Sequence, residues 1–229
     1  MNLLVFLTHN FNNEFLNTLS KVDSLFTDLT AIVLCDSSAD IPAINLKNIA
    51  ILPTDKCKTS YDRLGHSMVI NYFRTNRDSI DKYKYIWIVE NDVYYPNSFK
   101  QFIDRYNDYE YDLLVPEYGL RAKGWMWTAS LTGFTNTSSI GVLAVVLRFS
   151  SRLLAHLVDN IDKNYSGYFE AILPHICLEY GFSLQQFFPE MCGVLTTDNG
   201  HPMLRFLKMD IINKTRNFIQ DKIYHPIKL

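Results

Sequence analysis

The sequence predicts an α/β protein in which helices flank a central, mostly parallel β-sheet. Short apolar runs rich in Val, Ile and Leu alternate with longer segments whose apolar residues recur every three to four positions. The short runs are continuously apolar, which is typical of strands that helices cover on both faces. The length of 229 residues suits one large domain with a sizeable core.

The first 115 residues are predicted to form β-α-β units. We expect strands at 3–7, 30–34, 48–52, 85–89 and 111–115, and helices at 13–26, 65–73 and 98–106. Ser98 is a suitable cap for the last of these helices. The first strand is not followed by G-x-G-x-x-G or by a phosphate loop, which argues against a dinucleotide-binding Rossmann enzyme and a P-loop NTPase.

The second half is less regular at its start. Residues 116–136 lack periodicity and are expected to form a binding loop or lid, in which Trp125 and Trp127 either stack on a ligand or pack on the core. After them we expect a strand at 140–147, helices at 150–159 and 167–180, the second capped by Ser166, and a strand at 182–188. Periodicity is lost from Cys192 onward.

Two carboxylates lie at the carboxyl end of one predicted strand. Glu90 and Asp92 follow the run Ile86–Val89, at a strand's carboxyl end, where open α/β sheets bind ligands. Such carboxylates repel each other unless a cation or hydrogen-bond donors compensate, and magnesium-like ions take carboxylate and phosphate oxygens as ligands. The pattern predicts a cation bound together with a diphosphate. Alternatively, the pair caps the next helix or faces solvent, because so short a motif recurs by chance.

Composition and charge exclude several classes. A net charge of −2 argues against a protein that binds nucleic acid through its phosphates. The four cysteines form no C-x-x-C pair, so no zinc site or disulfide framework is expected. The apolar segment 140–158 is interrupted by Arg148 and Arg152, which argues against a transmembrane span, and the N-terminus lacks the basic region of a signal peptide. These features lead us to expect a cytoplasmic protein.

The order of these elements and motifs resembles the GT-A-fold glycosyltransferases, which are nucleotide-diphospho-sugar transferases. The shared layout is a series of β-α-β units, an E-x-D at a strand end, a later strand, a helix bearing a glutamate, and His-Pro-x-Lys near the C-terminus. The most specific part is Trp87-Ile-Val-Glu-Asn-Asp-Val93, which is similar to a W-x-x-E-x-D-V variant of the family's D-x-D motif. The resemblance implies a single GT-A-like (Rossmann-like) domain over residues 1–229, with a nucleotide-sugar-binding half (1–115) and an acceptor-side half with the C-terminal tail (116–229).

The resemblance also implies a metal site. Asp92 would bind Mn²⁺ or Mg²⁺, with Glu90, in place of the family's usual aspartate, near the ribose or the metal's water shell. A C-terminal histidine would complete the site, and His225 fits better than its rival His201. Lys228 would reach the diphosphate. For both histidines the alternative is a tail residue without a ligand role.

Further roles follow from the same resemblance. Glu170, preferred over Asp159, would be the general base for an acceptor hydroxyl in an inverting enzyme. The nucleobase and ribose would be held by the strand-end residues Thr8, His9 and Asp36. The pyrophosphate would contact Arg63 and Arg74, for which surface salt bridges are the alternative.

The expected activity is metal-dependent transfer of a sugar from a nucleotide-diphosphate sugar to a glycan or other hydroxyl acceptor. A non-catalytic nucleotide-sugar-binding module on the same fold is the first alternative. A nucleotidyltransferase is the second, and it is weakened because the segment after the first strand, Thr8–Asn13, contains no glycine.

Overall fold

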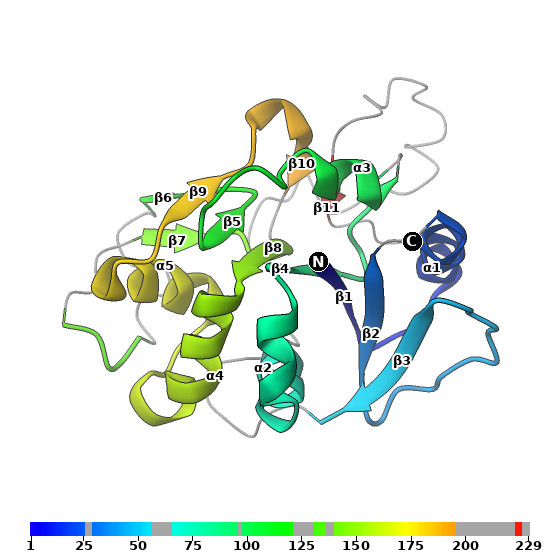
Figure 1. Ribbon diagram of the computed structural model, residues 1–229, viewed down its shortest axis with the longest axis horizontal. Coiled ribbons are helices and arrows are strands. Elements are labelled where there is room, and N and C mark those ends of the chain that lie inside the picture. The colour runs from blue at the N-terminus through cyan, green and yellow to red at the C-terminus, as the bar shows by residue number, and fades with distance from the viewer. Residues whose placement is uncertain are drawn as a thin grey trace, which may run out of the picture.

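The computed structural model describes residues 1–25, 29–55, 66–95, 98–120, 131–135, 140–195 and 223–225. At its centre is a seven-stranded sheet in the order β3-β2-β1-β4-β8-β5-β9 (Figure 1). The strands are β1 (Asn2–Thr8), β2 (Thr30–Asp36), β3 (Ile49–Thr54), β4 (Tyr85–Glu90), β5 (Leu113–Val115), β8 (Val146–Ser150) and β9 (Leu184–Gln186). Strand β8 is antiparallel to both of its neighbours, and the other strands of the sheet run in one direction. The predicted α/β fold with a mostly parallel central sheet is confirmed.

Helices cover both faces of this sheet. One face packs against α2 (His66–Thr75), α4 (Ser151–Asn164) and α5 (Phe169–Tyr180), and the other packs against α1 (Asn13–Leu25) and α3 (Phe99–Asp104). Alternate residues of β1 divide between the two cores: Leu3, Val5 and Leu7 face the first set of helices, and Leu4 and Phe6 face the second. Burial on both faces explains why the strands read as continuous apolar runs.

Short elements complete the described part of the chain. They are the 3-10 helices Arg77–Lys82 and Pro189–Met191, the antiparallel pair β6 (Tyr118–Leu120) and β7 (Ile140–Val142), and the parallel pair β10 (Cys192–Leu195) and β11 (Ile223–His225). Among the described helices, none is long and apolar enough to cross a membrane. Cys35, Cys177 and Cys192 are free thiols, and Cys57 lies outside the described residues.

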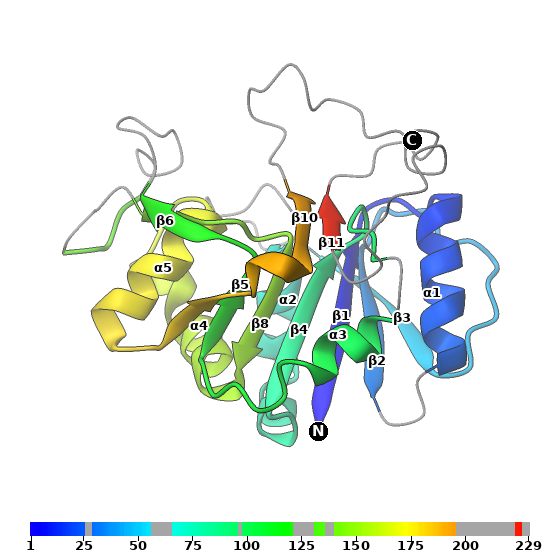
Figure 2. The same cartoon turned by 90° about the horizontal axis from the view of Figure 1, so that it is seen from above.

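The strand order of the sheet reverses at β1, which makes the gap between β1 and β4 a topological switch point. From β1 the chain adds β2 and β3 on one side and then returns to place β4 on the other side. In open α/β sheets such a switch point leaves a crevice beyond the carboxyl ends of the two strands, where ligands bind. The carboxyl ends of β1 and β4 therefore mark the expected binding edge, and Figure 2 shows β11 at this same edge, opposite the N-terminus.

Three sequence-based predictions of elements were wrong. The apolar run 140–147 is not one strand: Ile140–Val142 pairs with β6, the chain then leaves that pairing, and Val146 begins β8 beside β4. Because residues 141–147 are all buried, the apolar pattern of the run carries no sign of the change of sheet.

Ser166 does not cap α5. Its backbone pairs with Thr132 in both directions, and its hydroxyl lies 2.6 Å from the Thr132 hydroxyl. Gly167 then takes a φ of 134°, a conformation that favours glycine, and the helix begins only at Phe169 with Tyr168 as N-cap. The third miss is the pair β10 and β11, which form after Cys192 where no periodicity was visible.

Candidate metal centre

Strand β4 carries the two predicted carboxylates to the switch point. Glu90 is its last residue, and its backbone N–H donates to Val145 O at 3.0 Å. The chain then turns, with Val93 N donating back to Glu90 O, so that Asp92 also lies at this strand end. Between them, Asn91 donates from Nδ2 to Asn10 O at 3.3 Å and so links the ends of β4 and β1. The carboxylates therefore lie at the carboxyl end of β4, next to the end of β1.

His225 reaches the same place from the C-terminal region. Strand β11 pairs with β10, and its first residue, Ile223, is fully buried in the core beside Phe187 and Met191. Residues two apart in a strand face the same side, so the burial of Ile223 also turns His225 inward. The imidazole Nε2 of His225 lies 3.2 Å from Asp92 Oδ1 and 3.4 Å from Glu90 Oε2.

The two carboxylates of this cluster determine the pKa of His225. Burial alone would lower the pKa of His225, but the carboxylates of Asp92 and Glu90 outweigh burial and raise that pKa to about 9. Near neutral pH the imidazolium thus compensates part of the negative charge of the pair. A metal ion at this position would have to replace the His225 proton.

The arrangement suits a divalent cation. One ligand atom from each of Glu90, Asp92 and His225 lies within 4.8 Å of the other two. Neighbouring ligands of a six-coordinate ion with bonds of about 2.1 Å are about 3 Å apart, close to the two distances from His225 Nε2. Within the described chain, the ion pairs of Glu90 and Asp92 are with histidines and not with Lys or Arg. The cluster could therefore hold a metal ion.

The structure places the other predicted strand-end residues at the same edge but gives them local contacts. The Thr8 hydroxyl is buried and bonds to Asn10, donating to its carbonyl at 2.6 Å and accepting from its N–H at 3.0 Å. His9 is exposed. Asp36 accepts from the backbone and hydroxyl of Ser38, which shapes the turn after β2. Their contact with a nucleotide stays a prediction.

The predicted base and its rival lie in different settings. Glu170 is buried, with 4% of its surface exposed, in the first turn of α5. Asp159 instead lies half exposed on α4 and makes an ion pair with Arg77 at 3.0 Å. Arg74 is exposed in the last turn of α2, roughly 12 Å along the helix from its first residue. That position favours a surface role over the pyrophosphate contact we expected.

Arg63, His201 and Lys228 lie outside the described residues, as do Trp125 and Trp127. One further side chain near the cluster was missed by sequence reasoning. His66 is fully buried at the start of α2, and its Nε2 lies 3.9 Å from Glu90 Oε1. A lone histidine at the start of an apolar helix gives no signal in the sequence of such a neighbour.

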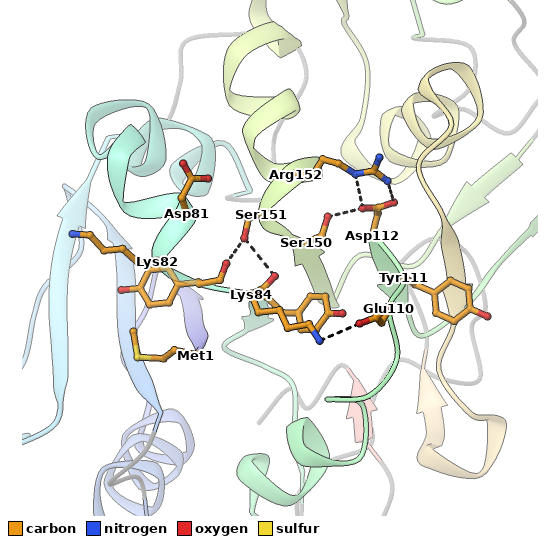
Figure 3. A pocket seen from close by; sticks show the side chains of 12 residues that line it. Met1, Asp81, Lys82, Lys84, Glu110, Tyr111, Asp112, Ser150, Ser151 and Arg152 are labelled. Carbon is orange, nitrogen blue, oxygen red and sulfur yellow. Dashed lines mark hydrogen bonds and ion pairs between the residues drawn. The ribbon is translucent and has the colours of Figure 1, made fainter.

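A hollow of about 570 Å³ lies at the opposite edge of the sheet, near the N-terminus (Figure 3). Four of its charged side chains, Asp112, Arg152, Lys84 and Glu110, form ion pairs with one another. Asp112 accepts from Arg152, Ser150 and Ser183, and Lys84 lies 3.5 Å from Glu110. These contacts give the paired side chains a role in holding the fold together, without a ligand.

No family model and no curated protein sequence matches this chain. Among solved structures, the fold is similar to that of the bifunctional IspDF from Campylobacter jejuni, with a TM-score of 0.46 and 13% sequence identity. The similarity covers 81% of this chain and 49% of the IspDF chain, so this chain spans about half the length of that protein.

Proposed function

We propose that this protein is a metal-dependent glycosyltransferase that moves a sugar from a nucleotide-diphosphate sugar to a hydroxyl acceptor. The observation that carries the proposal is the meeting of Glu90, Asp92 and His225 at the switch point between β1 and β4. The first two were expected from the E-x-D motif. The third comes from a segment more than 130 positions later in the chain, and a shared ligand would explain why the fold buries it there.

The residues present fit a divalent cation by their chemistry. Two carboxylates and one imidazole form a donor set that suits Mn²⁺, since carboxylates favour Mg²⁺ and Mn²⁺ and the imidazole favours the transition metals. In the proposal Asp92 and His225 bind the cation directly, and Glu90 binds it or orders its water shell. When bound, such a cation would stabilise the charge of the departing nucleoside diphosphate.

The remaining chemistry is assigned to the chain itself. Glu170 is proposed to accept the proton of the acceptor hydroxyl if the configuration inverts. Its place supports this, because Phe169 beside it stacks on His66, which in turn lies against Glu90. Thr8, His9 and Asp36 are proposed to contact the nucleoside, since they lie at the carboxyl ends of the neighbouring strands β1 and β2. The division into halves at residue 115 stays a prediction.

The test is a thermal-shift screen of nucleotide-diphosphate sugars with and without Mn²⁺, followed by detection of the products. We expect one donor to raise the melting temperature only when Mn²⁺ is present, and to release nucleoside diphosphate on incubation. Asp92→Asn should abolish both effects. The matched control is Asp104→Asn, which alters an exposed aspartate paired with Lys100 on α3 and should change neither.

Other outcomes would overturn the assignment. Metal-dependent donor binding without any release of nucleoside diphosphate, with or without acceptors, would indicate a non-catalytic binding module. Release of pyrophosphate from a nucleoside triphosphate and a sugar phosphate would indicate a nucleotidyltransferase. Equal shifts with and without Mn²⁺ would remove the metal from the proposal.

A further inference from the structure

His66 is a fully buried imidazole whose proton can be located from its partner. Its Nε2 lies 2.9 Å from Ala144 O. A carbonyl oxygen can only accept, so Nε2 carries the hydrogen in this contact. The N–H therefore points into the region that joins β7 to β8, where Val145 O receives the backbone N–H of Glu90. His66 and the Glu90 backbone are thus anchored on adjacent residues.

The same nitrogen faces the Glu90 carboxylate. Nε2 of His66 is 3.9 Å from Oε1 of Glu90, while Oε2 of that carboxylate is 3.4 Å from His225. A separation of 3.9 Å is too long for a hydrogen bond, and the Nε2 hydrogen is donated to Ala144 O, so the contact is an electrostatic one between the polar imidazole ring and the carboxylate. Inside a protein the low dielectric strengthens such a contact. The two oxygens of Glu90 are therefore divided between an internal histidine and the proposed cation site.

The imidazole ring is held in place from a third direction. It stacks on the ring of Phe169 with centroids 5.0 Å apart and planes inclined by 14°. Phe169 is the first residue of α5 and is itself buried against Phe149. With one face stacked and Nε2 bonded, the ring has little freedom to turn away from Glu90.

We propose that His66 is a positioning residue for the cation site: it holds Oε1 of Glu90 so that Oε2 remains directed toward His225 and Asp92. This inference rests on the proposed function, because it assigns a role toward the cation of that same site. Groups that orient metal ligands change metal affinity by about 10- to 100-fold when removed. His66 would do so without touching the cation.

The experiment measures the Mn²⁺ dissociation constant of the full chain by titration calorimetry, and the melting temperature without metal. His66→Phe keeps the stacked ring and removes the N–H, so we expect Mn²⁺ to bind about 10- to 100-fold more weakly. His66→Gln places an amide N–H near the Nε2 position and should restore the affinity to within about threefold of the wild type. A buried histidine of α5, His175, offers the matched control, and His175→Phe should leave the Mn²⁺ affinity unchanged.

A double-mutant cycle shows whether His66 acts through Glu90. In a Glu90→Gln background, adding His66→Phe should weaken Mn²⁺ binding less than twofold further, because the carboxylate it positions is gone. Full additivity would overturn the inference, as would wild-type affinity in His66→Phe or equal losses in the Phe and Gln variants. If wild-type Mn²⁺ binding depends on Asp92 and His66→Phe has no effect, this inference alone fails. If the wild type binds no Mn²⁺, the proposed function fails and the inference fails with it.

Discussion

At the amino-terminal edge of the sheet, Asp112 accepts hydrogen bonds from Arg152, Ser150 and Ser183, whereas at the carboxyl-terminal edge Glu90 and Asp92 share the imidazole of His225. Both edges hold buried or half-buried carboxylates. At the first edge one carboxylate meets several donors, and at the second two carboxylates meet one cationic ring. Among the residues that the structure describes, the protein thus completes the first site with its own groups and leaves the second with more carboxylates than cationic groups.

A buried cation near the amino-terminal edge follows the same rule as Asp112. Arg148 on β8 is fully buried, and it donates to the carbonyls of Tyr106, Tyr109 and Tyr111. Its guanidinium also lies 3.7 Å from the ring centre of Tyr85, and burial lowers the pKa of Arg148 to about 10. The positive charge of Arg148 thus holds the segment between α3 and β5 in place. At the other edge the described carboxylates outnumber the described cationic groups, which would suit the proposed cation.

The largest effect is expected from Arg148→Met. The change removes three hydrogen bonds that the buried guanidinium donates, so we expect the free energy of unfolding to fall by about 4 kcal/mol. Urea denaturation measures this, and Arg148→Lys should lie between the two because it keeps the charge but not the forked geometry. A loss below about 1 kcal/mol would show that the guanidinium is not the anchor of this edge.

At the carboxyl-terminal edge, Asp92→Asn should weaken Mn²⁺ binding strongly and change the stability of the fold little. We expect Mn²⁺ affinity to fall at least about 100-fold, equivalent to about 2.7 kcal/mol, because the proposed charged ligand is lost. The free energy of unfolding without metal should change by less than about 1 kcal/mol, since the residue is partly exposed. Calorimetry and urea denaturation of the same variant check both values, and a large loss of stability would show that the two edges are not different in kind.

Asp112→Asn should have the opposite effect to Asp92→Asn: it should lower the stability of the fold and leave Mn²⁺ binding unchanged. The amide cannot accept from Ser183 and Arg152 as the carboxylate does, so we expect a loss of about 2 kcal/mol in unfolding free energy and unchanged Mn²⁺ affinity. Urea denaturation at neutral pH measures the first quantity. A variant as stable as the wild type would show that the Asp112 contacts contribute little.

The pH dependence of stability provides a further test at Asp112. Burial would raise the pKa of Asp112, but the hydrogen bonds from Arg152, Ser183 and Ser150 outweigh it, and the pKa is lowered. The folded state therefore binds fewer protons at this group than the unfolded chain. Its stabilisation is present above the ordinary aspartate pKa of about 3.9 and is lost as the pH falls through the lower folded-state value. Unfolding free energies from pH 6 to pH 2 should fall less steeply in Asp112→Asn than in the wild type.

The smallest effect is expected from Lys84→Ala. Lys84 and Glu110 form an ion pair at 3.5 Å in the same hollow, but both side chains are more than half exposed. Such pairs contribute under about 1 kcal/mol, so the unfolding free energy should change by no more than about 0.5 kcal/mol. A larger change would show that exposed pairs, and not only buried ones, hold this edge together.

Much of the fold could be predicted from local pattern. The strand Tyr85–Glu90 and the helix that Ser98 caps were expected within one or two residues, because apolar runs and a cap are local signals. The change of sheet after Val142 and the late start of α5 at Phe169 could not be predicted. Both depend on partners far away in sequence, namely β4 beside Val146 and Thr132 beside Ser166.

The sequence by itself determined that the chain forms an alternating α/β protein and that Glu90 and Asp92 end a buried strand, since propensity and burial pattern act over a few residues. Only the tertiary structure decided which distant groups meet those carboxylates. His225 lies next to Asp92 because Ile223 is buried in the core. His66 lies next to Glu90 because α2 begins beside the end of β4. Distances in space depend on how the elements pack, and no spacing along the chain encodes that directly.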